Sequence, residues 1–294
     1  SYFDNDFLNK LKKNKNFENK KNYKKISIVM PSYNQAKLIE RSILSVLNQN
    51  YPNTELIIVD GGSKDGTDKI IKKYQDFISL WISEKDQGQS DALNKGFKHC
   101  TGEIYGWLNS DDIYLPNAFK NITSVLKKNS SKKIVFGDWL SINKQDQIID
   151  YNHAFDFNLN HFKYESFHLN SQSMFWHRSV HNRFSGFQID LSNTMDYQMI
   201  VEFGINEGEQ SFIRTPYALG AFRRYKGQKT SGMNTKVLKE HRLISKRYKY
   251  LDKYKVAGKL KRLYFRFRRA VWYYKRGGII NLINRIRKAY VIFR

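Results

Sequence analysis

Short apolar runs alternate with helical patterns between residues 26 and 112, and this alternation constrains the fold more than any other feature of the chain. The apolar runs predict strands at 26–30, 55–60, 79–83 and 103–108. Apolar periodicity predicts helices between them, near 38–47, 68–74 and 90–99. Such alternation is typical of right-handed crossovers and a parallel sheet. We therefore predict an α/β fold whose ligands bind beyond the carboxyl ends of the strands.

Acidic residues stand at three of these strand ends. Asp60 ends the second predicted strand, Asp86 follows the third, and Asp111 and Asp112 follow the fourth. A carboxylate at a strand end can accept hydrogen bonds from a ribose or a base, and a pair can hold a hard divalent cation. Each alone is also a common turn former or helix cap. Their joint placement predicts a polar site at one edge of the sheet.

Four sequence stretches, taken in order, resemble the motifs of family 2 glycosyltransferases. They are PSYNQ at 31–35, IVDGGS with DGT at 58–67, ISEKDQG continuing to DALNKG at 82–96, and LNSDD at 108–112. The resemblance covers roughly residues 26–230. It implies a GT-A type α/β domain with a mainly parallel central sheet flanked by helices. It also implies an inverting, metal-dependent transfer of a sugar from a nucleotide-diphosphate donor.

The resemblance assigns donor-binding and metal-binding roles to residues of these motifs. Asp111 would be the principal ligand of Mn²⁺ or Mg²⁺, with Asp112 supporting it or facing the donor sugar. Asn109 stands where the family has an acidic residue, which lowers the charge of the site by one, although one or two carboxylates suffice for such an ion. The implied donor-binding residues are Pro31, Ser32, Tyr33, Asp60, Asp86, Asn94, Lys95, Asn109, Ser110 and Asp112.

The second half of the chain is predicted to supply the catalytic base. Residues 191–197 resemble the family segment in which an Asp opens a helix, which implies Asp196 as the base. An acceptor hydroxyl becomes a good nucleophile only as its proton is removed, and one carboxylate does this in an in-line, inverting displacement. A helix cap is the alternative interpretation of Asp196. Further strands are expected at 133–142, 147–151 and 212–222, and the helix at 195–203.

Two more segments resemble parts of the family site. Residues 171–176 are similar to its acceptor-side strand, which implies Gln172 and Trp176 on the acceptor side. Residues 222–231 resemble the loop that closes over the donor diphosphate, where Arg224 and Lys229 can neutralise phosphate. Tyr225 stands where many relatives carry a metal-binding His, which predicts weaker metal dependence.

The net charge of +24 is concentrated at the two ends of the chain. Residues 236–294 hold 20 Lys and Arg against two acids, and residues 1–25 hold eight Lys against three acids. We predict a basic lead-in (1–25), a catalytic domain (26–235) and a basic amphipathic helical extension (236–294) interrupted at Gly277-Gly278. The extension favours peripheral attachment to an anionic membrane surface over a solvated helix packed on the domain.

These features predict a cytoplasmic enzyme at the inner face of the cell membrane. The single cysteine, Cys100, fits a reducing compartment, and neither a spanning helix nor a signal peptide is evident. The predicted activity is a hexosyl- or N-acetylhexosaminyl-transferase, with a UDP-sugar donor and a glycan or lipid-linked acceptor in surface polysaccharide synthesis.

Several alternatives compete with this interpretation. The charge alone suggests a polyanion or nucleic-acid binder, but the central domain is near-neutral and no nucleic-acid partner is expected. A nucleotidyltransferase lacks its Gly-rich and Lys signature, and the loop after Asp60 lacks the Lys of a phosphate-binding P-loop. An inactive family relative stays open, because of Asn109 and Tyr225. His177 and His181 have zinc-like spacing but are interpreted as surface residues.

Overall fold

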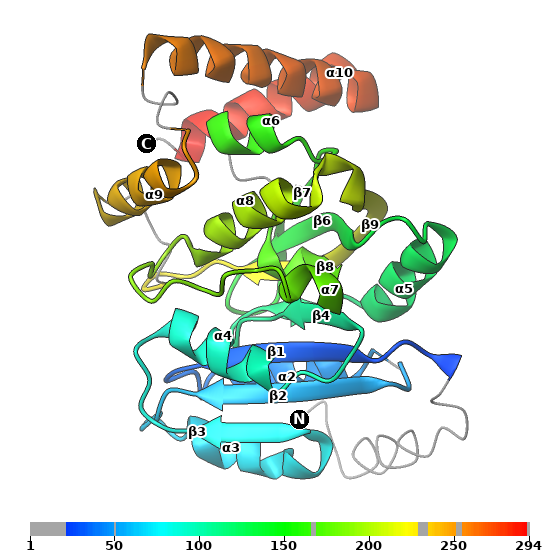
Figure 1. The fold of residues 1–294 in the computed structure, drawn as a ribbon, viewed down its shortest axis with the longest axis vertical. Coiled ribbons are helices and arrows are strands. Elements are labelled where there is room, and N and C mark those ends of the chain that lie inside the picture. Colours follow the sequence, from blue (N-terminus) through cyan, green and yellow to red (C-terminus); the bar gives the residue numbers. More distant parts are fainter. Residues whose placement is uncertain (1–21, 50, 166–168, 229–234, 251–254, 293–294) are drawn as a thin grey trace. The chain divides into compact units, whose positions relative to one another are not determined.

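The computed structural model describes residues 22–49, 51–165, 169–228, 235–250 and 255–292 (Figure 1). The chain forms two compact units, one made of residues 1–157 and 168–240 and the other of residues 158–167 and 241–294. The two units divide after Glu240, inside a helix that spans Thr235–Arg247. The domain boundary predicted at 235–236 lies at the start of that helix. The smaller unit also takes in a segment from the middle of the sequence.

A nine-stranded sheet forms the centre of the larger unit. Its strand order is β3 (Leu80–Ser83), β2 (Thr54–Asp60), β1 (Ile26–Ser32), β4 (Ile104–Trp107), β8 (Met174–His177), β6 (Ile134–Ile142), β9 (Phe212–Arg223) and β5 (Ile113–Tyr114), with β7 (Ile148–Asn152) paired to β6. The first four strands are parallel, as predicted.

Beyond β4 the sheet is mixed rather than parallel. Strand β8 is antiparallel to both of its neighbours, β4 and β6. Strands β6 and β7 also pair antiparallel, because the short turn between them leaves no room for a crossover. Strands β6 and β9 return to parallel pairing, and β5 is antiparallel to β9. The expectation of a mainly parallel sheet therefore describes the N-terminal half of the sheet.

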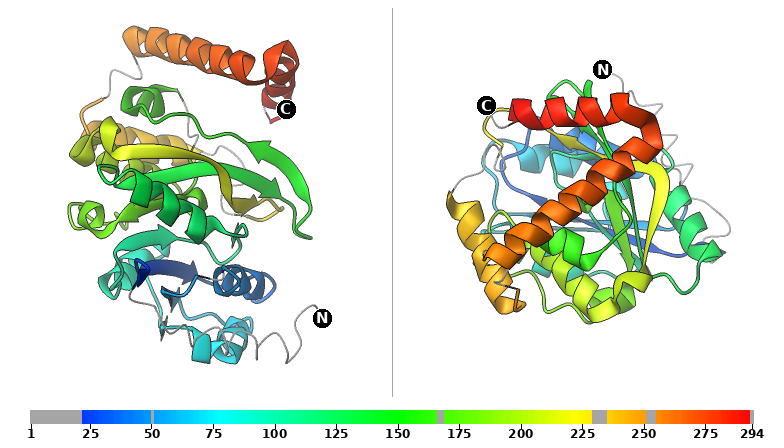
Figure 2. Two further views of the ribbon diagram at one scale, coloured as in Figure 1. Left: turned by 90° about the vertical axis from the view of Figure 1, so that its right-hand side faces the viewer. Right: turned by 90° about the horizontal axis from the view of Figure 1, so that it is seen from above.

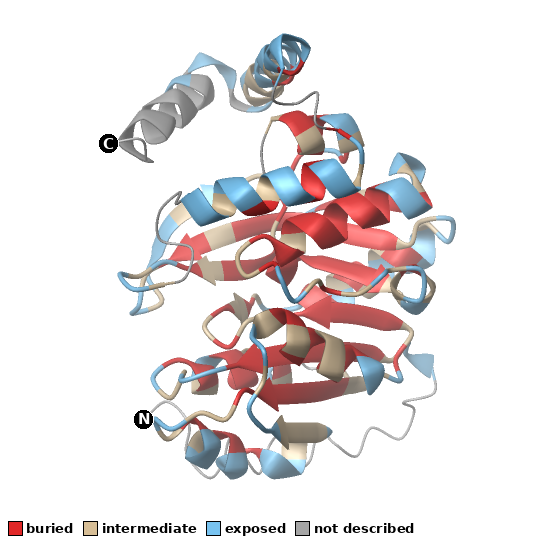
Figure 3. Ribbon diagram, turned by 60° about the vertical axis from the view of Figure 1, so that its left-hand side comes forward, coloured by how far each residue is buried: buried red, intermediate tan, exposed pale blue. Residues whose placement is uncertain are grey.

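Helices cover both faces of this sheet (Figures 1 and 3). Alternation along β2 shows the two layers, since Ile58 belongs to the core under α2 (Ile39–Leu47), α3 (Thr67–Lys73) and α5 (Ala118–Lys128), whereas Ile57 and Val59 pack with Ala92 of α4 (Gln89–Lys98). Neighbouring residues of a strand point to opposite faces. The same face as α4 holds α7 (Arg178–His181) and α8 (Met195–Glu207), through an aromatic cluster around Trp176.

His181 belongs to that cluster, so its interpretation as a surface histidine was wrong. Its ring centroid lies 4.5 Å from that of Phe97 and 5.3 Å from that of Tyr105. Burial lowers the pKa of His181 to about 4. An uncharged imidazole at the end of a short helix packs here as an aromatic ring.

The predicted strands and helices of the larger unit all occur, with ends shifted by a few residues. The described part of this unit also contains the short 3₁₀ turns η2 (Gln75–Phe77), η3 (Ser171–Ser173) and η4 (Glu209–Ser211). Helix α9 (Thr235–Arg247) begins in this unit and ends in the smaller one.

The smaller unit joins α6 (Leu159–Tyr164) to α10 (Val256–Ile292). The ring of His161 stacks on Phe265 with centroids 5.0 Å apart, and Arg269 pairs with Glu165 at 2.7 Å. The expected interruption at Gly277-Gly278 appears as a bend within one helix, because Gly278 adopts φ 64° (Figure 2). Among the described residues, no helix is long and apolar enough to cross a membrane.

Candidate active site

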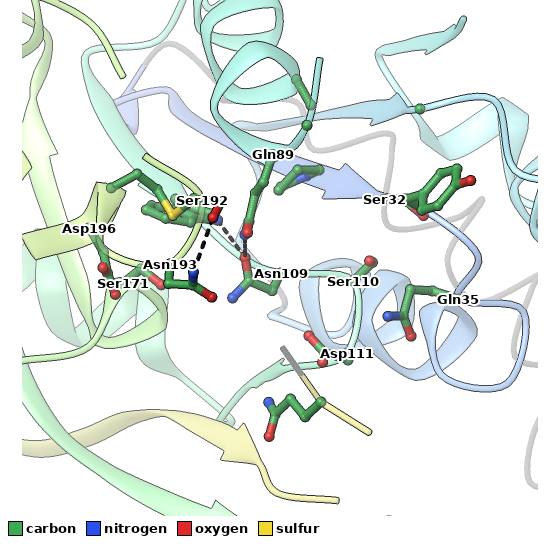
Figure 4. A pocket seen from close by; sticks show the side chains of 18 of the residues that line it. Ser32, Gln35, Gln89, Asn109, Ser110, Asp111, Ser171, Ser192, Asn193 and Asp196 are labelled. Carbon is green, nitrogen blue, oxygen red and sulfur yellow. Dashed lines mark hydrogen bonds between the residues drawn. The ribbon is translucent and has the colours of Figure 1, made fainter. Parts of the chain in front are cut away.

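A pocket of about 690 Å³ opens at the carboxyl ends of β1 and β4, entirely within the larger unit (Figure 4). This volume is in the range of small-molecule sites in proteins. Eight of the residues predicted from the sequence line it: Pro31, Ser32, Tyr33, Asp86, Asn109, Ser110, Asp111 and Asp196. The pocket therefore brings together residues that are up to 165 positions apart in the sequence.

Asp111 enters the pocket from the loop after β4. The Tyr225 hydroxyl donates a hydrogen bond to its Oδ2 atom over 3.0 Å, and the Arg223 Nε atom donates to its backbone carbonyl over 2.7 Å. Burial raises the pKa of the Asp111 carboxyl, while the Tyr225 hydrogen bond and the Arg223 charge act in the opposite direction. This carboxyl is thus poorly solvated and faces the space where a charged ligand would lie.

Asp112, by contrast, does not line the pocket. Its carboxylate accepts hydrogen bonds from the Arg223 backbone N–H over 2.8 Å and from Asn109 Nδ2 over 3.2 Å. Full burial, followed by the nearby Asp111 charge, raises the pKa of Asp112 well above its ordinary value. The side chains of Asp111 and Asp112 point in different directions, and Asp112 bonds the loop to β9. Asp112, predicted to support the metal, therefore does not face the pocket.

A divalent ion at this site would have Asp111 as its ligand from the pocket lining. Among the described residues, no group of three or more His, Cys, Asp and Glu side chains is arranged to hold a metal. Mg²⁺ and Mn²⁺ nevertheless bind well through one or two carboxylates when waters and diphosphate oxygens complete the shell. The oxygen-rich surroundings of Asp111 fit such an ion, and they do not form a metal cage made by protein alone.

Asn109 is a junction in the hydrogen-bond network of the pocket floor. Its Oδ1 atom accepts from Gln89 Nε2 over 2.7 Å (Figure 4) and from Trp107 Nε1 over 2.7 Å, and its Nδ2 atom donates to Asp112. An amide can both accept and donate, whereas a carboxylate only accepts. The Asn found where the family carries an acidic residue is therefore matched to its neighbours in this chain.

Asp60 holds the turn beside the pocket through its hydrogen bonds. Its fully buried carboxylate accepts from the Ser63 hydroxyl over 2.5 Å, from the Ser63 N–H over 2.9 Å and from the Ser83 hydroxyl over 3.1 Å. Gly61 lines the pocket in its place, and a Cβ atom there would lie 2.7 Å from Asp86 Oδ2. Asp60 therefore shapes the turn that carries Gly61, and it is not part of the described pocket lining.

Three more predicted donor-binding residues lie away from the pocket. Asn94 bonds with both the N–H and the carbonyl of Phe187, over 2.9 and 2.7 Å, which ties α4 to the loop before α8. Lys95 pairs with Glu84 at 2.8 Å, and Arg224 is solvent-exposed. Asn94 and Lys95 are on α4, and Arg224 follows the end of β9, and none of the three is in the pocket lining. Lys229 is outside the described residues.

The predicted acceptor-side residues are both buried in the protein. Trp176 packs against Phe203 with ring centroids 5.4 Å apart, and Gln172 is fully buried in the turn before β8. The neighbouring Ser171 lines the pocket instead. The predicted segment therefore reaches the pocket, but through Ser171, which precedes Gln172 in the same 3₁₀ turn.

Asp196 lies in the first turn of α8 and lines the pocket (Figure 4). The helix begins after Thr194, so Asp196 is not the capping residue, and its Oδ1 accepts from the N–H of Tyr197 over 2.8 Å. Ser192 and Asn193 line the pocket beside it. Asp196 and Asp111 thus line one cavity, Asp196 from the first turn of α8 and Asp111 from the loop after β4.

Sequence reasoning missed part of the pocket lining. Gln35, Gln89, Ser192 and Asn193 stand inside stretches that resemble the family, so position within such a stretch is an available signal. The other unpredicted lining residues include Lys85, Gly88, Ala92, Trp107, Asn170, Met195, Phe222, Gly227 and Gln228.

Solved structures show which fold this is. The chain resembles Staphylococcus aureus TarS in complex with UDP-GlcNAc, with a TM-score of 0.61 at 16% identity over 75% of this chain and 65% of that one. It also resembles the Pyrobaculum calidifontis mannosyltransferase PcManGT in complex with GDP-Man and Mn²⁺, with a TM-score of 0.58 at 15% identity over 98% of this chain and 88% of that one. The fold is the GT-A glycosyltransferase fold, as predicted.

The chain belongs to glycosyl transferase family 2, whose family model matches residues 27–184. An uncharacterised glycosyltransferase of Rickettsia typhi is 39% identical over 110 residues, which are 37% of this chain and 34% of that protein. Escherichia coli WfgD, a UDP-Glc:α-D-GlcNAc-diphosphoundecaprenol β-1,3-glucosyltransferase, is 36% identical over 119 residues, 40% of this chain and 47% of that protein. The matched region therefore spans less than half of these relatives.

Proposed function

We propose that this chain transfers a hexosyl or N-acetylhexosaminyl group from a UDP-sugar to a hydroxyl of a glycan or lipid-linked acceptor, with inversion at the anomeric carbon. The observation that carries the proposal is that Asp111 and Asp196 line one pocket. The chain's similarity to WfgD, whose name gives a UDP-Glc donor and a diphosphoundecaprenol-linked acceptor, supports the choice of uridine and of a lipid-linked acceptor. A role in surface polysaccharide synthesis would follow from such an acceptor.

Asp196 is the proposed general base. As the acceptor oxygen attacks the anomeric carbon, its proton passes to the Asp196 carboxylate and the bond from that carbon to the diphosphate oxygen breaks. The displacement is in-line, so a single inversion results and no covalent enzyme intermediate forms. The strand ends would bind the nucleotide through Ser32, Tyr33 and Asp86, which the pocket presents together.

Asp111 is the proposed protein ligand of Mn²⁺ or Mg²⁺, an ion that stabilises negative charge on a departing diphosphate. PcManGT, a similar fold, was solved with Mn²⁺. In this chain the Tyr225 hydroxyl contacts Asp111, and burial, followed by the Asp111 charge, raises the pKa of Tyr225 to about 12. Tyr225 therefore stays protonated and acts as a hydrogen-bond donor, which supports the prediction of weaker metal dependence.

Calorimetric titration of UDP tests this function. With Mn²⁺ we expect binding that EDTA weakens, and we expect Asp111→Ala to abolish the difference. Asp68→Ala, an exposed carboxylate outside the pocket, is the matched control and should bind as the wild type does. If the wild type binds neither UDP nor a UDP-sugar under either condition, the proposed function is wrong, and an inactive relative or a polyanion binder is favoured.

The smaller unit is the proposed membrane-binding part of the protein. On α10, Leu260, Leu263 and Phe267 are 63%, 59% and 67% exposed. Tyr274 continues this apolar stripe, and the opposite face buries Phe265 against α6. Such spacing of three and four residues places the exposed side chains on one face of a helix.

Basic residues border this exposed apolar face. Lys261, Arg268 and Lys275 recur every seven residues along one side of it, and Lys259 and Arg266 border the other. An apolar stripe between two basic borders matches the interface of an anionic bilayer, where apolar groups insert and cations meet headgroups. We therefore propose an anionic lipid surface as the occupant of this face. Attachment to the inner face of the cell membrane stays a prediction that follows from it.

Vesicle sedimentation of the full chain tests this surface. We expect binding to phosphatidylglycerol-containing vesicles, little binding to neutral phosphatidylcholine vesicles, and at least a tenfold loss in Leu263→Ser/Phe267→Ser. The matched control, Ile148→Ser/Ile149→Ser, changes two exposed apolar residues of β7 and should bind normally. Equal binding by both variants, or a concentration-dependent dimer that only the first variant disrupts without vesicles, would refute the proposal.

A further inference from the structure

A buried carboxylate on α9 gathers an unusual number of hydrogen bonds from one loop. Glu240 is 3% exposed. Its Oε1 atom accepts from the Ser192 N–H over 3.1 Å, from the Ser192 hydroxyl over 2.9 Å and from Asn193 Nδ2 over 3.3 Å. Its Oε2 atom accepts from the Asn193 N–H and from the Thr194 hydroxyl, both over 2.9 Å. One side chain thus binds three consecutive residues.

The bound loop leads directly into the pocket. Ser192 and Asn193 line the pocket themselves, and Thr194 is the residue before α8, whose first turn carries Asp196 (Figure 4). The Thr194 side chain makes no capping hydrogen bond to the helix, and its hydroxyl donates to Glu240. The entry into α8 is therefore fixed by a carboxylate from a helix 46 residues further along the chain.

A second buried carboxylate, Glu202, also holds a loop by hydrogen bonds and offers a comparison with Glu240. Glu202 accepts from the N–H and the hydroxyl of Ser185, over 2.6 and 2.8 Å, and is 5% exposed. Ser185 does not line the pocket, whereas Ser192 and Asn193 do. Both carboxylates are buried and both accept hydrogen bonds from a serine N–H and hydroxyl, although Glu240 also binds Asn193 and Thr194. The two carboxylates differ in that the loop bound by Glu240 lines the pocket, whereas Ser185 does not.

We propose that Glu240 is a positioning residue for the acceptor side of the pocket, holding Ser192 and Asn193 in place and setting the direction of Asp196. This inference rests on the proposed glycosyl transfer, in which Asp196 faces the acceptor. It also extends the catalytic domain through the first turns of α9, past the boundary at 235 that charge composition predicts. Glu240 itself is not part of the described pocket lining.

The chemistry of the clamp depends on two acceptor oxygens. Gln has the same shape, but one oxygen becomes an NH₂ group that faces hydrogen-bond donors. In either orientation the NH₂ group faces a backbone N–H, that of Ser192 or that of Asn193, and this donor loses its acceptor. Glu240→Gln should therefore loosen the loop while preserving the volume of the buried site.

The experiment combines hydrogen exchange and kinetics on the full chain. In Glu240→Gln we expect the Ser192 and Asn193 amides to exchange at least tenfold faster, the acceptor KM to rise or kcat to fall at least tenfold, and UDP affinity to stay within twofold of the wild type. Thr194→Val, which removes a single bond, should shift the same quantities less. Glu202→Gln, the matched control, should lower the melting temperature and leave them unchanged.

Two results would overturn the positioning role. One is unchanged exchange at Ser192 and Asn193 in Glu240→Gln. The other is an effect on UDP affinity as large as the effect on the acceptor, because that is the behaviour of a general brace. A wild type without transfer activity would instead reject the proposed function, and the exchange measurement would still decide whether Glu240 holds the loop.

Discussion

The pocket has two walls that are built in different ways. The strand-end wall includes Pro31, Ser32 and Asp111, which follow or end parallel strands. The loop wall includes Ser171, Ser192, Asn193 and Asp196, which lie on a 3₁₀ turn and at the entry to α8. Backbone ladders hold the first wall, and the single Glu240 side chain holds much of the second. The second wall should therefore be far more sensitive to individual side chains.

The largest expected effect comes from the loop wall. Asp196→Asn keeps the shape of the side chain and removes the proton acceptor, so we expect kcat to fall by roughly 10²–10⁴-fold. UDP affinity, which belongs to the strand-end wall, should be unchanged. Initial rates of transfer and calorimetry on the same preparation check both. Equal losses in the two measurements would mean that the walls are not functionally separate.

A second change tests the floor shared by the two walls. Asn109→Asp makes the residue resemble the family motif, but it replaces the donor Nδ2 with an oxygen facing the buried Asp112 carboxylate. We expect a loss of about 1–3 kcal/mol of folding stability and no gain in Mn²⁺-dependent UDP affinity. Denaturant unfolding measures the first quantity. A variant that is more stable and binds Mn²⁺ more tightly would contradict the assignment.

Close packing within the strand-end wall predicts a smaller effect. Gly61→Ala places a methyl group 2.7 Å from Asp86 Oδ2, so this short side chain must move, at a cost of about 1 kcal/mol. Thermal unfolding should show the loss, and the double variant Gly61→Ala/Asp86→Ala should recover most of it. Additive losses in the double variant would show that the two residues do not press on each other.

The smallest effect is a pH dependence of the loop wall. Burial alone would raise the pKa of Glu240, but the hydrogen bonds from Asn193, Ser192 and Thr194 lower it below its ordinary value. A depressed carboxyl stabilises the fold above the unfolded-state pKa of about 4.3, and this stabilisation is lost as pH falls through the folded-state pKa. The unfolding free energy of the wild type should therefore fall more steeply below about pH 4.3 than that of Glu240→Gln. Parallel curves would exclude the linkage.

The two walls also differ in how far the sequence revealed them. Asp86, Asn109 and Asp111 could be predicted because parallel strands joined by helices bring their carboxyl ends to one edge, wherever the rest of the chain lies. Asp60 and Asp112 were placed in the same region but turn out to support it. Sequence position locates a strand end, but the direction of each side chain there depends on the loop geometry.

The loop wall was recognised as a region and misassigned in detail. Ser171 lines the pocket where Gln172 and Trp176 were expected, since the turn and the aromatic cluster around Trp176 decide which side chain faces outward. Glu240 lies in a segment whose composition is dominated by Lys and Arg, and nothing in its local pattern indicates a partner at Ser192.

By itself, the sequence determined the alternation of strands and helices, the family and the acidic edge of the sheet, because these follow from local periodicity and from short motifs. The tertiary structure decided which carboxylates face the pocket, that Asn109 and Asp112 share a hydrogen bond, and that Glu240 holds the entry to α8. These contacts join residues that are distant in the sequence or whose side-chain directions depend on packing. Their free energy depends on positions that become fixed only when the whole unit folds.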